Sequence, residues 1–185
     1  AREGDFSSLE LLFGSIPDLL SQLVRTAFIP SKGCRFIVSD FSAIEARVIA
    51  WLADEDWVLN VFRTHGKIYE ATASQMFRIP LDRIAKGRPE YEYRQKGKVA
   101  TLALGYQGGV GALIQMKALE QGLTEEELPG IVSRWRRANP HIVRLWREVE
   151  NAAIEALDGG EVHLRHGLIF RCARNRLEIR LPSGR

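Results

Sequence analysis

The chain has 185 residues, 45% of them hydrophobic and 26% charged, which is enough for one domain with an apolar core or for two small lobes. No apolar run approaches the ~20 residues of a membrane span, and the N-terminus carries no signal-peptide pattern. We therefore expect a soluble, cytoplasmic protein without a membrane partner. Cys34 and Cys172 belong to no CxxC pair and are expected to be free thiols.

The net charge of +3 is distributed unevenly along the chain. Residues 163–185 contain six arginines against a single acidic residue, Glu178. A cationic segment of this kind suits a polyanionic partner such as a nucleic acid. A solvated chain end has the same composition, so charge alone leaves both interpretations open.

In chain order, a polar lead (AREGDFSS) precedes a helical segment at residues 16–24, IPDLLSQLV. Residues 28–33 (FIPSKG) indicate a turn. Residues 34–40 (CRFIVSD) combine β-branched and aromatic side chains and predict a buried strand. Ser42 is then the expected N-cap of a helix over 43–53, where apolar residues recur at helical spacing.

The remainder is predicted to be mostly helical, with strands at the end. Further helices are expected over residues 57–62, 67–77, 93–104, 124–138 and 141–157. Acids at 54–56 suit the positive end of a helix dipole. Thr124–Glu127 has the spacing of a capping box, and Asn139-Pro140 ends the helix that follows it. After Gly159-Gly160, alternation predicts hairpin strands, so the fold class is α+β and predominantly helical.

Asp40 ends the predicted strand and directly precedes a helix. The carboxyl end of a strand opens toward a cleft, and a carboxylate there is a hard oxygen ligand suited to Mg²⁺. An Asp in this place also serves as a helix cap. Glu45 lies in the first turns of the same helix, so the two carboxylates can border one pocket. The alternative for Glu45 is a surface residue that stabilises the helix N-terminus.

Residues 93–109, YRQKGKVATLALGYQGG, place Arg94, Lys98, Leu102 and Tyr106 at four-residue intervals. At ~100° per residue these positions form one inclined ridge, and the opposite side carries small residues suited to close packing. A triphosphate, a sugar and a base laid along the ridge would meet cations first and flat or apolar groups last. A plain surface helix has the same pattern.

Three other features are interpreted as structural. Glycines at 105–111 follow a helix and precede another, so they indicate close backbone approach and not a phosphate-binding loop. His163-x-x-His166 lies on a predicted hairpin with no acidic or Cys partner at ligand spacing. Arg134–Arg137 (RWRR) mixes aromatic and basic residues near a helix end and predicts a solvated face.

Together these segments resemble the family A DNA polymerases, the DNA polymerase I type. DFSAIEAR, within residues 25–62, resembles that family's first catalytic motif (DYSQIELR), and KIYEATASQMF resembles its DIHTxTAxxxF segment. YRQKGKVATLALGYQGG resembles the fingers helix with the pattern RxxxKxxxFxxxYG. NPHIVRLW and LPSGR resemble the later fingers and the stretch that leads into the second half of the palm. The resemblance spans nearly the whole chain in the family's order, and LALGYQGGVGA is most similar to phage and prophage members.

The resemblance implies a partial palm plus the helical fingers of a right-hand polymerase. Residues 1–62 would form the N-terminal part of the palm, 63–157 the fingers helices, and 158–185 hairpin-like strands leading back into the palm. The implied activity is that of a DNA-directed DNA polymerase, which adds deoxynucleotides to a primer 3′ end by two-metal phosphoryl transfer. Mg²⁺ is the implied cofactor, and primer–template DNA and deoxynucleoside triphosphates are the implied partners.

The same resemblance implies roles for single residues. Asp40 would be a catalytic metal-binding aspartate, and Phe41 would offer the metal its backbone carbonyl. Glu45 would exclude a ribose 2′-hydroxyl. Arg94 and Lys98 would bind the incoming triphosphate.

Further residues of the implied site lie along the nucleotide and the DNA. Tyr106 would guard the position of the templating base, and Arg25 and Arg185 would lie near the primer–template. Leu102 stands where the family usually has Phe or Tyr, so aromatic stacking near the incoming sugar is missing. Tyr69 stands where the family usually has His, which puts a phosphate contact there in doubt.

No His-Asp-Glu motif follows within these residues, and the family's thumb is not represented. Two-metal chemistry requires a second carboxylate, so we expect the isolated chain to be an inactive fragment of the polymerase. The alternative, from a different functional class, is a non-catalytic helical nucleic-acid-binding module in which the basic residues at 163–185 bind the nucleic acid.

Overall fold

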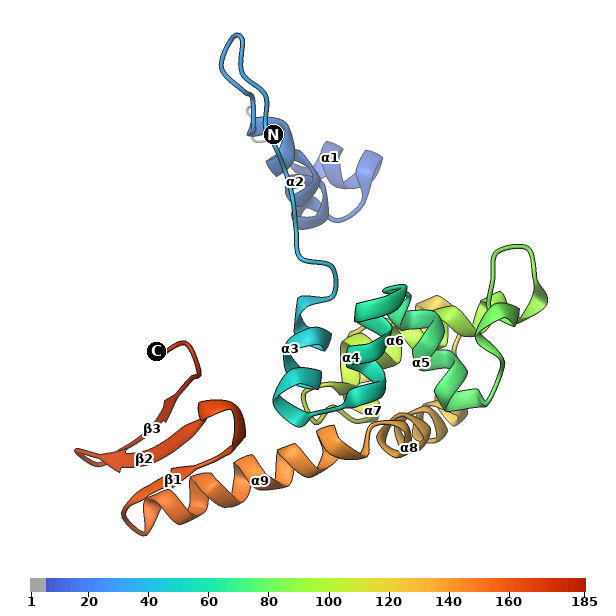
Figure 1. The fold of residues 1–185 in the computed structure, drawn as a ribbon. Coiled ribbons are helices and arrows are strands. Elements are labelled where there is room, and N and C mark those ends of the chain that lie inside the picture. The colour runs from blue at the N-terminus through green and yellow to red at the C-terminus, as the bar shows by residue number, and fades with distance from the viewer. Residues whose placement is uncertain (1–5) are drawn as a thin grey trace. The chain divides into compact units, whose positions relative to one another are not determined.

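The computed structural model describes residues 6–185, and the chain divides into two units, Ala1–Phe41 and Ser42–Arg185 (Figure 1). The first five residues of the predicted polar lead lie outside the described residues. Helices dominate, and the only sheet among the described residues has three antiparallel strands, which confirms the predominantly helical α+β class at this coarse level. No helix in the described part of the chain is both long and apolar enough to cross a membrane.

The first unit contains two short helices, α1 (Phe6–Phe13) and α2 (Ile16–Val24), and a 3-10 turn, η1 (Arg25–Ala27). The predicted helix over 16–24 is confirmed, and Pro17 lies in its first turn, where its missing N–H has no helical partner to lose. The predicted turn is also present, since the N–H of Cys34 donates to the carbonyl of Ser31 at 2.9 Å.

The predicted strand at residues 34–40 is wrong. The segment pairs with no other strand among the described residues, and its apolar side chains are exposed, Ile37 by 85% and Val38 by 90%. Composition favours an extended backbone here, but a strand also needs a neighbour to accept and donate its ladder hydrogen bonds. Nothing in residues 6–185 supplies that neighbour.

The second unit carries the remaining helices: α3 (Ile44–Ala53), α4 (Asp56–Thr64), α5 (Ile68–Phe77), α6 (Tyr93–Leu104), α7 (Val110–Gln115), α8 (Leu128–Ala138) and α9 (Pro140–Leu157). Short 3-10 turns connect them: η2 (Leu81–Arg83), η3 (Pro89–Glu92), η4 (Leu119–Gln121) and η5 (Glu125–Glu127). The predicted helices are confirmed, whereas α7 was not predicted. The capping box is present, since the N–H of Thr124 donates to Glu127 Oε2 at 3.0 Å.

The start of α3 differs from the prediction in its cap. The N-cap residue is Ala43, which has a left-handed backbone (φ 50°), and not Ser42. Because the chain enters the helix through this left-handed residue, the Ser42 hydroxyl does not cap the first turn. The Ser42 carbonyl instead accepts a hydrogen bond from Arg47 Nε at 2.8 Å.

Helices α5 and α6 pack with their backbones nearly in contact, because Gly97 lies at their crossing. A Cβ atom on Gly97 would lie 2.2 Å from the carbonyl oxygen of Tyr69 and 2.9 Å from the amide nitrogen of Ala73. Only glycine permits this approach. The main core extends from here through α8 and α9, with Leu104 and Ile142 among its fully buried members.

Glu55 joins the start of α4 to the start of α9. Glu55 as a whole is 4% exposed, and its carboxylate accepts hydrogen bonds from the N–H groups of His141 and Ile142 at 2.9 and 3.2 Å. Burial raises the pKa of Glu55, although the two N–H donors oppose the shift. The acidic residue that we expected at the dipole of the following helix therefore caps a helix distant in sequence.

The three strands, β1 (Glu161–His163), β2 (Ile169–Ala173) and β3 (Arg176–Arg180), form an antiparallel sheet in the order β1-β2-β3. Figure 1 shows this sheet beside the C-terminal part of α9, where Phe170 packs against Ala152 and Ala156. The turn between β2 and β3 has positive φ at Arg174 and Asn175, the conformation that tight two-residue hairpins require. The predicted hairpin strands are confirmed.

Candidate functional site

Three of the four residues of the predicted ridge lie on α6. Arg94, Lys98 and Leu102 belong to the helix, which ends at Leu104, so Tyr106 lies in the turn that follows. The small residues opposite the ridge, Val99 and Ala103, are buried in the core. Because this side of α6 packs into the core, the opposite face is the one that solvent can reach. Arg94 and Lys98 lie on that face and are half-buried.

Arg94 already has an anionic partner. Its Nε donates to Glu70 Oε1 at 2.9 Å, and both side chains are partly buried. The guanidinium also lies over the rings of Tyr69 and Tyr91, 5.4 and 5.8 Å from their centroids. Glu70 and Tyr69 reach it from α5 because the glycine crossing brings the two helices together. The position of Arg94 is thus fixed by three neighbours.

Lys98, one turn further along α6, is the less constrained cation. Within residues 6–185 it forms no ion pair. An ammonium group with three unshared donors can meet an incoming anion at little cost in existing contacts. Of the two predicted phosphate-binding residues, Lys98 is therefore the one with free capacity.

Tyr106 and Glu45 lie close enough to interact electrostatically. The Tyr106 side chain is 64% exposed; partial burial raises the pKa of its phenol, and the negative charge of Glu45 raises that pKa further. Glu45 stands in the first turn of α3 and is itself exposed. The negative charge of one residue assigned to the sugar and base end of the nucleotide therefore acts on the phenol of the other.

The loop that carries Tyr106 is fixed on both sides. The indole N–H of Trp146 donates to the Gly105 carbonyl at 3.1 Å, and Arg136 donates to the Gly108 carbonyl at 3.2 Å. A Cβ atom on Gly108 would lie 2.1 Å from the Ala103 carbonyl oxygen. The interpretation of these glycines as sites of close backbone approach is confirmed at Gly108.

The other predicted site residues lie elsewhere in the chain. Asp40, Phe41 and Arg25 belong to the first unit, and all three are exposed. Arg185 is the last residue and is also exposed. In the described part of the chain no group of three or more His, Cys, Asp or Glu side chains is arranged to hold a metal ion.

The two histidines of the hairpin region both contact carboxylates. His163 Nε2 lies 2.7 Å from Glu161 Oε1, and His166 Nε2 lies 2.8 Å from Asp54 Oδ1. The hydrogen bond from His166 is the largest of the effects that lower the pKa of Asp54. The His166 ring also packs on Trp51, with centroids 4.5 Å apart. The contacts of His166, which lies between β1 and β2, tie this region to α3 and to the residue that follows it, whereas the contact of His163 stays within β1.

Glu70 is the residue that the sequence did not reveal. It is 24 residues from Arg94, and nothing in its own surroundings in the sequence marks it as a partner. The available signal was Gly97, since a glycine in the middle of a helix often permits a close approach by another backbone. That signal predicts that another backbone approaches α6 at Gly97, but it does not identify which residue of the other helix contacts Arg94.

Known proteins that are similar to this chain are DNA polymerases. Residues 3–157 match the family model described as DNA polymerase family A. The chain is 62% identical over 183 residues to the DNA polymerase of Bacillus phage SP02, covering 98% of this chain and 28% of that protein. It is 27% identical to DNA polymerase I of Pseudomonas aeruginosa, over 86% of this chain and 17% of that protein.

A third relative is the thermostable DNA polymerase I of Thermus aquaticus, 30% identical over 70% of this chain and 14% of that protein. The chain thus spans less than a third of the length of each of these relatives. The matched family model covers most of the chain and includes α3, α6 and the loop with Tyr106. This chain belongs to DNA polymerase family A.

Proposed function

We propose that this chain contributes the nucleotide-binding side of a DNA-directed DNA polymerase. The observation that supports the proposal is the open face of α6, where Lys98 is unpaired next to a fixed Arg94. At the far end of the same row, Tyr106 interacts with Glu45. Cations at one end, and at the other an aromatic ring that feels the charge of a carboxylate, match the order of groups in a nucleoside triphosphate.

The two cations would bind different parts of one triphosphate. Four residues of helix separate them by ~6 Å of axial rise, within the length of a phosphate chain. Lys98 acts as a mobile point charge, and Arg94 offers the donors that Glu70 leaves unused. Both would stabilise negative charge that develops on the leaving phosphates. Tyr69, which contributes a ring beside Arg94, would shape the phosphate end of the site.

Sugar and base would lie toward the turn after α6. Glu45 would meet the sugar, where its carboxylate excludes a 2′-hydroxyl by occupying the space that the hydroxyl needs. Leu102 offers an apolar contact between the phosphates and the base. The exposed Tyr106 ring would stand at the templating position. Arg25 and Arg185, both exposed cations, would contact the DNA backbone.

Asp40 and the Phe41 carbonyl are proposed as part of a Mg²⁺ site. Both residues are exposed, and their oxygens are hard donors of the kind that Mg²⁺ takes alongside water and substrate phosphates. When bound, Mg²⁺ supplies charge neutralisation at the phosphates. Two-metal transfer needs a further carboxylate beside Asp40, so we propose that the isolated chain binds nucleotide without turning it over.

The test compares nucleotide use with DNA binding in the full-length polymerase that contains this chain. Lys98→Ala should raise the KM for deoxynucleotide by about tenfold or more, since a charge-assisted contact contributes on the order of 1.5–3 kcal/mol. The Kd for primer–template should stay within about twofold. Arg63→Ala, which removes an exposed cation from α4, serves as the control. An equal loss of nucleotide and primer–template binding would favour the non-catalytic binding module.

A further inference from the structure

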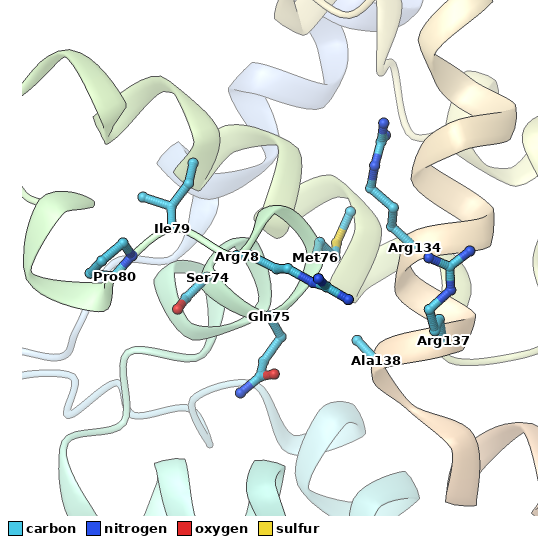
Figure 2. A pocket seen from close by; sticks show the side chains of 9 residues that line it. All are labelled: Ser74, Gln75, Met76, Arg78, Ile79, Pro80, Arg134, Arg137 and Ala138. Carbon is cyan, nitrogen blue, oxygen red and sulfur yellow. The ribbon is translucent and has the colours of Figure 1, made fainter.

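A hollow of about 510 Å³ lies between the end of α5 and the last turns of α8 (Figure 2). Three arginines line it: Arg78, which directly follows α5, and Arg134 and Arg137 on α8. Ser74 and Gln75 add polar groups, and no acidic side chain lines the hollow. None of its lining residues belongs to α6, so it is separate from the proposed triphosphate contacts.

Among the described residues the three arginines form no ion pair that would neutralise them, and one of them packs on an aromatic ring. Arg78 has a left-handed backbone (φ 57°) as the C-cap of α5, and Figure 2 shows its side chain extending toward α8. Arg134 lies over the Phe77 ring, 5.2 Å from its centroid. In the described part of the chain none of the three forms an ion pair.

Arg136, a neighbour of these arginines on α8, is an example of an arginine whose side chain serves the fold. Arg136, on the same helix, donates to the Gly108 carbonyl and lies over the Trp146 ring at 5.7 Å. Its donors and its planar face are therefore used within the protein. The side chains of Arg78 and Arg137 form no such contacts with residues 6–185, so their donors remain available to a ligand.

Helix dipoles explain part of this charge. Cations at a helix C-terminus are stabilised by the partial negative charge there, and both Arg78 and Arg137 lie at helix ends. Each residue alone would need no other explanation. Two helix ends that converge on one hollow, however, place three like charges together with no acidic side chain in its lining, and Arg134 interacts electrostatically with Glu127 at the start of its own helix. Such an arrangement attracts a multivalent anion.

We propose that this three-arginine hollow binds phosphate groups. Arginine forks match phosphate oxygens bidentately. No aromatic residue lines the hollow, so nothing there stacks on a base, and recognition is directed to phosphate and not to a nucleoside. These features favour the backbone of a polynucleotide strand. The identity of the strand as polymerase template rests on the proposed function, whereas phosphate binding itself does not.

The test measures binding to the chain itself and needs no catalysis. The probes are a labelled single-stranded oligonucleotide and inorganic pyrophosphate, the second of which represents free phosphate. The variant Arg78→Gln/Arg137→Gln should weaken oligonucleotide binding at least tenfold. It should also reduce the slope of log affinity against log salt by about 1.4, since each lost contact to a single strand accounts for about 0.7.

The matched control is Arg63→Gln/Arg147→Gln, which removes two exposed cations from α4 and α9 and should change binding less than threefold. A loss confined to the oligonucleotide identifies a strand site, and a loss confined to pyrophosphate identifies a free-phosphate site. The double variant leaves the proposed triphosphate contacts on α6 intact, so a loss of oligonucleotide binding in this variant tests the hollow separately from the polymerase proposal. Arg134→Gln provides a third, milder variant if the double variant fails to fold.

One result would overturn the proposal. If Arg78→Gln/Arg137→Gln lowers the melting temperature while both probes bind as they do to the control variant, the arginines serve only the helix dipoles.

Discussion

The two units of the chain differ in whether they enclose a core of buried side chains. Ser42–Arg185 encloses a core of fully buried side chains such as Leu104 and Ile142, whereas no residue between 6 and 41 is buried. The proposed nucleotide contacts on α6 belong to the unit with the core, and Asp40 belongs to the other. The open face of α6 is therefore set by helix packing within one unit, whereas Asp40, the proposed metal ligand, ends a segment that has no ladder partner among the described residues.

The largest expected effect tests that contrast directly. Leu104→Ala should lower the free energy of unfolding by about 2–5 kcal/mol, because it opens a cavity in a closed core. Ile37→Ala, at a side chain that is 85% exposed, should change it by less than about 0.5 kcal/mol. Urea denaturation followed by circular dichroism measures both. Similar losses for the two variants would mean that the first unit has a core after all.

The crossing of α5 and α6 gives the next largest effect. Gly97→Ala gains roughly 1 kcal/mol of helix propensity but drives a methyl group into the Tyr69 carbonyl, 2.2 Å away. We expect a net loss of about 2 kcal/mol in unfolding free energy. The control is Gly111→Ala in α7, where a Cβ atom meets nothing within 4 Å and the substitution should stabilise. An unchanged free energy of unfolding for Gly97→Ala would show that α5 and α6 can move apart at little cost in free energy.

Glu55 and Asp54 should give the second unit opposite responses to pH. Burial raises the pKa of Glu55 above 4.5, so the folded state holds this proton more tightly and the contribution of Glu55 to stability falls as pH rises through that pKa. The hydrogen bond from His166 lowers the pKa of Asp54 below 3.8, so its contribution is lost as pH falls through that lowered value.

Denaturation curves between about pH 3 and 7 test this pair. Glu55→Gln should make stability rise more steeply with pH, because it removes the group whose pKa burial raises. Asp54→Asn should reduce the loss of unfolding free energy at the acidic end of this pH range. Slopes that change in the same direction for both variants would contradict the assignment of the Glu55 shift to burial.

The smallest expected effect concerns the partner of Arg94. Glu70→Gln removes the carboxylate that competes for Arg94, so the affinity of the polymerase for deoxynucleoside triphosphate should rise about two- to threefold, the scale of a partly exposed ion pair. Glu127→Gln is the matched control. It also removes one negative charge, but from the residue that pairs with Lys96, another cation of α6. Fluorescence titration measures both variants. A loss of affinity specific to Glu70→Gln would make Glu70 a residue that orients Arg94 for binding.

Features determined by nearby residues were predictable from the sequence. The capping box at Thr124, the break at Asn139-Pro140 and the helix over 16–24 each depend on side chains within a turn or two. The identity of α6 as a helix with one buried side followed from periodicity in the same way.

Features that depend on distant partners were not predictable. The strand at 34–40 failed because composition predicts an extended backbone but not the neighbour that makes it a strand. Glu70 was missed because its contact with Arg94 joins residues 24 positions apart. Glu55 was assigned to the dipole of the helix that follows it, whereas its carboxylate caps α9. In each case a tertiary contact outweighed the local pattern.

The most direct test of the central claim separates chemistry from nucleotide binding in the full-length polymerase. Single-turnover primer extension over a range of deoxynucleotide concentrations yields the maximal rate and the nucleotide Kd. Asp40→Ala should lower the maximal rate by about a thousandfold or more with little change in Kd, as expected for loss of an electrostatic contribution of about 4 kcal/mol. Lys98→Ala should mainly raise Kd. If both variants changed the same parameter to the same extent, the proposed division between the two units would be contradicted.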